Sequence, residues 1–370
     1  ELHDNGRSGV RIENGRNIEL SHVNSSGNGD SASSPDGGAG YVFIESNDVE
    51  SQSGDVHCYS CTSISDNWGG VWAKDSVDLS LDNFEIRDPD NDVPAIAVNN
   101  AGLTASQQGG WVDMTNIRTW TNGSSNAIKL ENAVAQINGL EMFGTHSGLY
   151  WNADHNLVLS SNLSNAKLSG SGNCVDLSDH SYLMGTNVSL TSDCTGTVTI
   201  SDSQINWSGL NDITGNHVLI LDENSDMRLH RPINVDISLA TLPGSATIGV
   251  AWDYGIWVVN QLGKGIPSAE VGVNFDQLNQ GYNYDSEYIG YNFFPNYLGQ
   301  VWTSAGSGSH TTVTVDCEYD NTTNSTSFSL DQDWVIYCRL DLANQAPFLI
   351  WSTPEDGDQY ASGSIVEFNA

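Results

Sequence analysis

The sequence predicts an all-β fold in which a solenoid of short, stacked strands is followed by an antiparallel β-sandwich. Three observations predict this fold. A five-residue pattern returns at intervals of 21 to 32 residues, the strand-like segments alternate apolar and polar residues, and no segment shows a helical period of useful length. Repeats of this size form coils that bury their apolar side chains only against neighbouring coils.

The repeat is clearest where "GVRIEN" (residues 9–14) returns as "AIKLEN" (residues 127–132). Seven segments share its order of apolar, outward, apolar, polar and polar residues, and they begin at Val10, Val42, Val71, Ile96, Ile128, Leu149 and Val175. A second period-two strand follows each segment, and clusters of Gly, Asn, Asp and Ser between the strands are typical of turns. The alignment places Arg11 and Lys129 at equivalent outward positions of one sheet.

This pattern resembles the right-handed parallel β-helix of the pectate-lyase-like superfamily, and the resemblance covers roughly residues 1–225. It implies a stack in which loops of different length leave the coil at fixed corners. It also implies that Cys174 and Cys194 lie on adjacent coils, because their separation of 20 residues is close to one coil. We expect a linker or cap over residues 226–244.

The composition changes after about residue 240, and residues 245–344 are predicted to form the sandwich. The segment "YGIWVVNQLGKGIPSAEVGVNF" resembles the first hairpin of carboxypeptidase-regulatory-like or bacterial Ig-like sandwiches. The matching residues are Gly265, Ile266, Pro267, Ala269 and Val271. Residues 345–370 resemble the opening strands of a further, truncated Ig-like domain, so we expect the chain to be a piece of a larger secreted or surface protein. The predicted fold class is therefore a right-handed parallel β-helix followed by an Ig-like antiparallel sandwich.

The charge of the chain excludes several classes of partner. Its 370 residues contain 12 Lys and Arg against 46 Asp and Glu, which gives a formal net charge of −34. Such a surface repels nucleic acid and anionic membrane surfaces. Salt screens the self-repulsion, so a marine or halophilic source is the compositional prediction.

The cysteines favour an extracellular, disulfide-bonded protein. Cys317 and Cys338 lie in strand-like runs, which makes a cross-strand disulfide reasonable. Cys58 and Cys61 have the spacing of half a zinc site or of a redox motif, but no second pair of this kind and no βαβ context accompanies them. A local disulfide or two buried thiols are therefore preferred to a metal or redox role.

The register predicts one outward face that could bind a glycan. Its predicted ligand-binding residues are Arg11, Phe43, Glu45, Trp72, Lys74, Lys129, Glu131 and Tyr150. Aromatic side chains stack on sugar rings, and polar groups beside them can hold hydroxyls or carboxylates. Ordinary solvated strand pairs are the alternative interpretation.

Catalysis on this face remains an alternative, because the resemblance implies a fold that hosts polysaccharide lyases and glycosidases. The polygalacturonase motifs that hydrolases of this fold carry are absent from the chain. A lyase would need a base, for which Lys74 and Lys129 are the candidates, with Glu131 beside them. Its base would need a pKa lowered by burial or by a second cation.

One acidic segment has alternate carboxylates, at Asp88, Asp90 and Asp92. This spacing can gather oxygen ligands around Ca²⁺, although Val93 and Asn99 stand where the calcium loop of an EF-hand needs Gly and Glu. A solvated acidic turn is the alternative, and no cofactor is certain.

Three functions therefore remain open. The first is a secreted or cell-surface protein that acts in adhesion or glycan binding without catalysis, with an extracellular polysaccharide or cell-surface glycan, and other surface proteins, as partners. The second is a lyase acting on an acidic polysaccharide. The third is a structural stalk or filament subunit.

Overall fold

A computed structural model describes residues 2–13, 17–30, 32–44, 55–74, 78–89, 92–99, 112–144, 146–153, 161–171, 173–276, 280–285 and 290–342. These residues form β-structure almost throughout; the helical segments among them are α1 (Pro35–Gly38) and the 3-10 turn η1 (Ile237–Leu239). None of the described helices is long and apolar enough to cross a membrane. The chain divides into two compact units, of which the first holds residues up to 253 together with 295–311 and 329–333.

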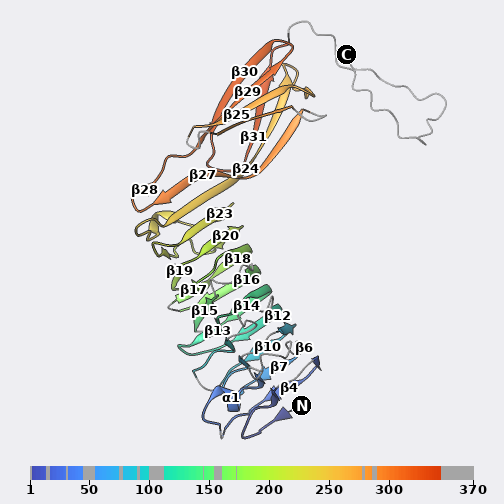
Figure 1. The fold of residues 1–370 in the computed structure, drawn as a ribbon, viewed down its shortest axis with the longest axis vertical. Helices are drawn as coiled ribbons and strands as arrows, with labels where there is room; N and C mark the ends of the chain where they lie inside the picture. The colour runs from blue at the N-terminus through green and yellow to red at the C-terminus, as the bar shows by residue number, and fades with distance from the viewer. Residues whose placement is uncertain are drawn as a thin grey trace, which may run out of the picture. The chain divides into compact units, whose positions relative to one another are not determined.

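The first unit is a parallel β-helix whose coils lie one upon another along three walls (Figure 1). The first wall is a nine-stranded sheet in which neighbouring strands belong to successive coils. Its strands are β2 (Val10–Glu13), β5 (Tyr41–Ile44), β8 (Val71–Lys74), β11 (Ile96–Asn99), β13 (Asn126–Glu131), β15 (Ser147–Asn152), β17 (Asn173–Ser178), β19 (Thr197–Ser201) and β22 (Leu219–Leu221).

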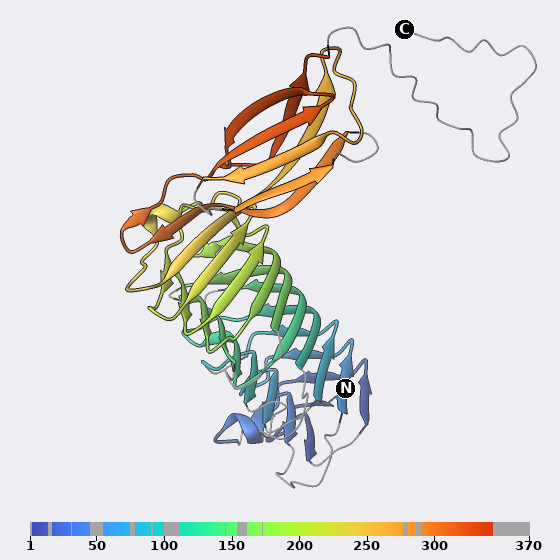
Figure 2. The same cartoon turned by 45° about the horizontal axis from the view of Figure 1, so that its top comes forward.

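The second and third walls begin as separate short strands and then share long ones. The second wall starts with β3 (Ile18–Ser21), β6 (Asp55–Tyr59) and β9 (Asp78–Asp82), and the third with β1 (Leu2–His3), β4 (Asn24–Ser26), β7 (Thr62–Ile64) and β10 (Glu85–Arg87). Both walls then continue in β12 (Val112–Trp120), β14 (Ala135–Phe143), β16 (Ser161–Gly170) and β18 (Leu183–Cys194). Figure 2 shows these long strands side by side.

A column of residues with positive φ makes the bend between the second and third walls. Its members are His22, Ser60, Asn83, Asn116, Gly139, Asn165 and Asn187, and their φ angles lie between 50° and 79°. Asn tolerates this left-handed conformation better than most residues and Gly adopts it without a steric cost. The Asn side chains also hydrogen-bond from coil to coil, as where Asn187 Nδ2 donates to Asn165 Oδ1 at 2.9 Å. The frequent Asn of the repeat therefore has a structural cause.

The register of the first wall confirms six of the seven predicted segment starts. The inward column runs through Val10, Tyr41, Val71, Ile96, Ile128, Leu149 and Val175, and continues to Val198 and Leu219. The exception is Val42, because Tyr41 takes the inward position on β5. All four residues of "YVFI" are apolar, so the period-two pattern did not fix which of them faces the core.

The stack continues beyond residue 225, into the segment where the sequence suggested a linker or cap. Strands β20 (Gln204–Ser208), β23 (Asp226–His230) and the first half of β24 (Thr247–Asn260) pair in parallel, one after another. A short strand, β21 (Asn211–Asp212), extends the third wall beside β18. Inside the walls lies one continuous apolar core that includes Trp151 and Trp207.

All six cysteines form disulfides, which indicates an oxidising, extracellular type of environment. Cys58 and Cys61 bridge the bend at Ser60, so the local disulfide is confirmed. Cys174 on β17 is bonded to Cys194 at the end of β18.

The second unit begins at Tyr254 and combines an antiparallel sheet with one parallel strand pair, β24 with β31, so it is not antiparallel throughout as the sequence predicted. One sheet has the order β26 (Gln280–Asp285), β25 (Glu270–Phe275), β29 (Thr312–Tyr319) and β30 (Thr322–Ser329). The second half of β24 pairs with β31 (Trp334–Leu340), and the start of β27 (Tyr291–Thr303) also belongs to this unit. Cys317 on β29 and Cys338 on β31 are disulfide-bonded. Because β29 pairs with β25 and β31 pairs with β24, this disulfide joins two strands that belong to different strand pairs. Residues 343–370, where a further domain was predicted to begin, lie outside the described residues.

Candidate ligand-binding face

The outward side of the first wall carries most of the predicted glycan-binding residues. Strand pairing places side chains of successive coils in two outward columns, about 4.8 Å apart from one strand to the next. The first column holds Arg11, Val42, Trp72, Ala97, Lys129, Tyr150 and Asp176. The second holds Glu13, Ile44, Lys74, Asn99, Glu131, Asn152 and Ser178.

Three predicted residues meet on β13 and β15. The Lys129 ammonium lies 2.7 Å from the Glu131 carboxylate and 5.8 Å from the centroid of the Tyr150 ring. Asn99, one coil earlier, donates from Nδ2 to Glu131 at 2.9 Å. The ion pair is about one-third exposed on each side chain. This Lys129 cluster, made of Asn99, Lys129, Glu131 and Tyr150, therefore offers donors, acceptors and a ring within reach of solvent.

One predicted residue of β5 does not contribute. Phe43 pairs with Ile12 and Ala73 and is 1% exposed, so its side chain belongs to the core and its predicted outward position is wrong. The cause is the one-residue offset on β5 described above. Glu45 lies outside the described residues.

The remaining predicted residues lie farther along the wall. Trp72 and Lys74 share β8, two strands or about 10 Å from Lys129 and Glu131, although Lys74 is the direct register partner of Asn99. Trp72 is partly buried, and its indole Nε1 is inaccessible and has no hydrogen-bond partner among the described residues. Arg11 forms an ion pair with Glu13 on its own strand, four strands from Lys129. The predicted face is thus one wall, but only its centre is a compact cluster.

Asp176 extends this cluster by one coil. It lies beside Tyr150 in register, and burial raises the pKa of its carboxyl group while a hydrogen bond with Asn173 opposes that shift. A carboxyl group next to the Tyr150 ring adds a further polar partner for a ligand. The sequence placed Asp176 in this column but did not single it out.

The acidic segment proposed for Ca²⁺ has another structural use. Asp92 accepts hydrogen bonds from the Ser124 hydroxyl and from the backbone N–H groups of Ser124 and Ser125, the last two at 2.7 and 2.6 Å, and these bonds, that of the hydroxyl above all, lower the pKa of its carboxyl group. Asp88 occupies a bend with φ of 47°, and Asp90 lies outside the described residues. Among the described residues no group of three His, Cys, Asp or Glu side chains is placed to hold a metal ion. What Asp92 does is join successive coils.

The third wall carries a ladder that the sequence did not reveal. The Arg87 guanidinium lies 4.6 Å over the Trp120 ring, whose other face stacks on Phe143 with centroids 5.0 Å apart. Beside this ladder runs a column of alternating charge, formed by Glu85, Arg118, Glu141 and Lys167. The ring faces of Trp120 are already covered by its neighbours, so this wall is built for stacking of coils rather than of sugars.

A hydrogen-bonded chain of Ser, His and Asp occurs near the end of the stack. Ser208 Oγ lies 3.1 Å from His230 Nδ1, and His230 Nε2 lies 2.7 Å from Asp253 Oδ1. The same carboxylate oxygen accepts the Asn296 N–H at 2.7 Å. Because Asp253 joins the last coil to residues 295–311, we interpret this chain as structural.

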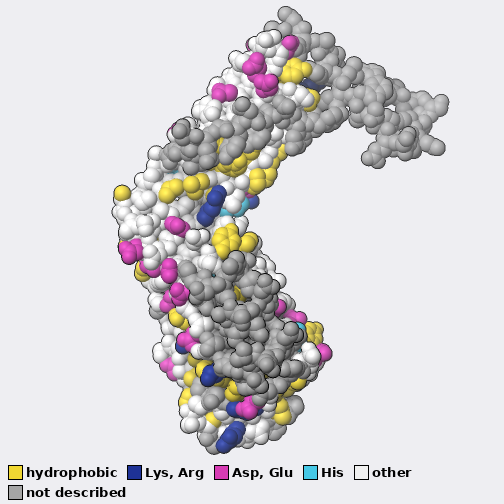
Figure 3. All heavy atoms as spheres, in the orientation of Figure 1, with side chains coloured by type: hydrophobic (Ala, Val, Ile, Leu, Met, Phe, Trp, Pro, Cys, Tyr) yellow, Lys and Arg dark blue, Asp and Glu magenta, His cyan; other side chains and the backbone are white. Residues whose placement is uncertain are grey.

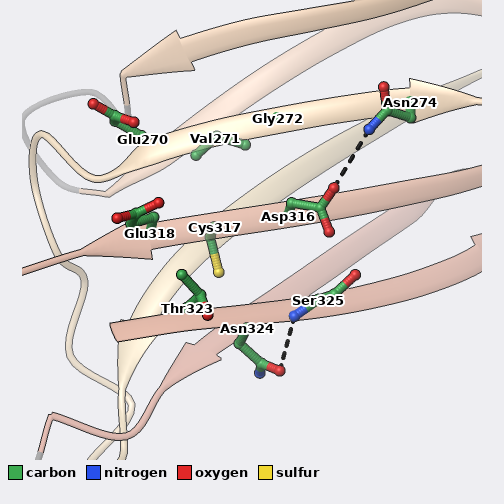
Figure 4. A pocket seen from close by; sticks show the side chains of 10 residues that line it. All are labelled: Glu270, Val271, Gly272, Asn274, Asp316, Cys317, Glu318, Thr323, Asn324 and Ser325. Atoms are coloured by element: carbon green, nitrogen blue, oxygen red, sulfur yellow. Dashed lines mark hydrogen bonds between the residues drawn. The ribbon is translucent and has the colours of Figure 1, made fainter. Parts of the chain in front are cut away.

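The hollows in the described surface do not coincide with the Lys129 cluster. One, of about 510 Å³, lies on the second wall at Glu19, His57, Tyr59 and Asp82. Another, of about 900 Å³, lies in the second unit, and Figure 4 shows the carboxylates of Glu270, Asp316 and Glu318 along it. On the face drawn in Figure 3, acidic side chains are widely spread and basic ones are isolated. Neither of these two hollows includes a residue of the Lys129 cluster.

Comparison with known proteins adds no family assignment. No protein-family model matches the chain, and no curated protein is found to be similar to it.

Proposed function

We propose that this protein binds extracellular polysaccharide or cell-surface glycan without catalysis, through the outward face of the first wall. The observation that carries the proposal is the Lys129 cluster, in which an exposed ion pair lies against a tyrosine ring at the centre of the wall. Sugar hydroxyls need both donors and acceptors, and a ring beside them supplies apolar contact. The three disulfides support a secreted or cell-surface location.

The wider assignment belongs to the same proposal. The coil stack resembles the pectate-lyase-like β-helix, and the second unit resembles an Ig-like spacer of adhesion proteins. A net charge of −34 suits solubility in the salty surroundings of a marine or halophilic organism.

The alternative is a lyase that acts on an acidic polysaccharide with Lys129 as the base. A base must be free to take a proton from the sugar, but the Lys129 ammonium is held by Glu131. The other candidate base, Lys74, lies two strands away from this pair. This arrangement favours binding over proton abstraction.

A glycan array probed with the full chain tests the proposal. Lys129→Ala and Tyr150→Ala should each weaken retention on the bound glycan by about tenfold or more, since each removes a group that contacts the sugar. Arg118→Ala is the matched control, because Arg118 is also an exposed cation that pairs with a glutamate, at 3.1 Å, but on the third wall.

The same samples separate the three functions. A rise in ultraviolet absorbance on a uronic-acid polymer, abolished by Lys129→Ala, would replace binding with lyase activity. Absence of retention on every glycan, together with end-to-end rods in micrographs, would instead favour a structural stalk. If neither Lys129→Ala nor Tyr150→Ala weakens retention, the glycan-binding site lies outside the Lys129 cluster.

A further inference from the structure

The second unit has an aromatic surface that its own core does not use. On β24, Tyr254, Ile256 and Val258 are buried, whereas Trp257 points to the opposite side of the strand. On β31, Val335 and Tyr337 are 52% and 60% exposed. Both strands therefore turn apolar side chains outward as well as inward.

Strand register brings these outward side chains together. Trp257 is the direct partner of Tyr337, and Gly255 is the partner of Val335. The Tyr291 ring comes from β27 and lies with its centroid 4.7 Å from that of Trp257. Phe293, two residues further on the same strand, is 55% exposed. We call Trp257, Tyr291, Phe293, Val335 and Tyr337 the aromatic platform.

A glycine makes room for one member of the platform. A Cβ atom at residue 255 would come within 2.3 Å of the Tyr291 hydroxyl and 2.6 Å of its ring. The absence of a side chain at Gly255 therefore lets the Tyr291 ring lie across β24 beside Trp257. The result is a continuous aromatic surface across β31, β24 and β27, about 10 Å wide at the strand spacing of a sheet.

Packing among the described residues of the unit does not explain this surface. The inner side of the same strands supplies the core contacts, as where Tyr254 stacks on Phe294 with centroids 4.8 Å apart. Contiguous exposed apolar side chains are a cost to a secreted protein and mark a site of interaction. Figure 3 shows hydrophobic side chains at the surface in the part of the molecule where Figure 1 labels β24 and β27.

Charge identifies the partner. The five platform side chains carry no charge, and a single cation, Arg339, is exposed beside them, two residues after Tyr337 on β31. The chain's net charge of −34 still repels a second copy of the chain or a polyanion on approach, and a polycation would meet carboxylates elsewhere rather than this surface. A neutral polysaccharide meets no such repulsion, because its ring C–H faces stack on aromatic rings and its hydroxyls can bond to the tyrosine hydroxyls. We propose that the aromatic platform binds a neutral, linear hexopyranose polysaccharide, at a site independent of the first-wall face.

Affinity electrophoresis of the full chain in polysaccharide-containing native gels tests this site. The probes are hydroxyethylcellulose, galactomannan and pullulan, with carboxymethylcellulose as the charged counterpart of the first. We expect retardation by at least one neutral polymer and weaker retardation by carboxymethylcellulose. Tyr337→Ala and Trp257→Ala should each weaken the binding by about tenfold.

Two controls distinguish this site from other causes. Leu262→Ala removes an apolar side chain that is 76% exposed in the same unit but outside the platform, so it should leave the retardation unchanged. Arg118→Ala, which removes an exposed cation of the third wall, should also leave it unchanged. Tyr337 is the more exposed of the two platform residues, so its substitution reports on binding even where Trp257→Ala disturbs folding.

Four results would overturn the proposal. They are the absence of retardation in all three neutral polymers, stronger retardation in carboxymethylcellulose, unchanged retardation of a folded Tyr337→Ala variant, and a dimer in sedimentation velocity that Tyr337→Ala dissociates. The last result would assign the platform to a second copy of the chain.

Discussion

At the scale of single residues, Asp176 shows how an outward carboxyl group of the first wall affects stability. Burial raises the pKa of its carboxyl group above the value in the unfolded chain. Folding therefore favours the protonated form of Asp176. Its contribution to the free energy of unfolding is most favourable below the pKa that the group has in the unfolded chain, and this contribution is lost as the pH rises through the raised pKa of the folded protein.

Asp176→Asn should accordingly stabilise the protein at neutral pH, by on the order of 0.5 kcal/mol after allowance for solvent screening, and have little effect in acid. Thermal unfolding as a function of pH measures this. Glu141→Gln is a control of opposite sign, because a hydrogen bond from Lys167 lowers the pKa of Glu141. The ionised Glu141 carboxylate stabilises the folded protein above the pKa that it has in the unfolded chain. This stabilisation is lost as the pH falls through the lower pKa that it has in the folded protein. Equal pH profiles for the two variants would contradict this account.

At the scale of the element, the bend between the second and third walls depends on residues that accept a positive φ. Asn187 has a φ of 54° and hydrogen-bonds the equivalent Asn165 of the preceding coil. A β-branched side chain in this conformation is strained, and it cannot make the bond.

Asn187→Val should lower the free energy of unfolding by about 2–3 kcal/mol, as measured by chemical denaturation. Asn187→Gly removes the hydrogen bond, but glycine adopts the positive φ without strain. The free energy of unfolding should therefore fall by only about 1 kcal/mol. A glycine variant as unstable as the valine variant would show that the hydrogen bond, and not the backbone conformation, matters at this bend.

At the scale of the whole molecule, the two units should unfold separately, and each holds its own disulfides. Cys174 and Cys194 close a loop with a sequence separation of 20 in the first unit. Loop-closure entropy assigns about 3 kcal/mol to a crosslink of this length.

Replacing both cysteines by alanine should lower the midpoint temperature of one calorimetric unfolding transition and leave that of the other unchanged. The matched pair Cys317→Ala and Cys338→Ala lies in the second unit and should affect the other transition. A single transition that both pairs lower equally would indicate that the units unfold together.

Much of the first wall could be predicted from sequence, because segments such as those at Val10, Ile128 and Val175 alternate apolar and polar residues and so fix their register. The apolar run at Tyr41–Ile44 has no such alternation, and the prediction for Phe43 failed there. The third-wall ladder could not be predicted, because the loops before Trp120 and Phe143 differ in length and hide their equivalence. The aromatic platform depends on the pairing of β24 with β31, strands that are about 80 residues apart, and no local pattern reports such a pairing.

The alternating column of Glu85, Arg118, Glu141 and Lys167 limits how this stack can change its length. Excising the one turn that bears Glu141 would leave two cations, Arg118 and Lys167, as neighbours. Excising two turns together would restore an acid next to a base. Natural shortening or duplication in this region should therefore remove or add an even number of coils. The alternation of side-chain charge imposes this constraint, whereas the backbone repeat would allow any whole number of coils.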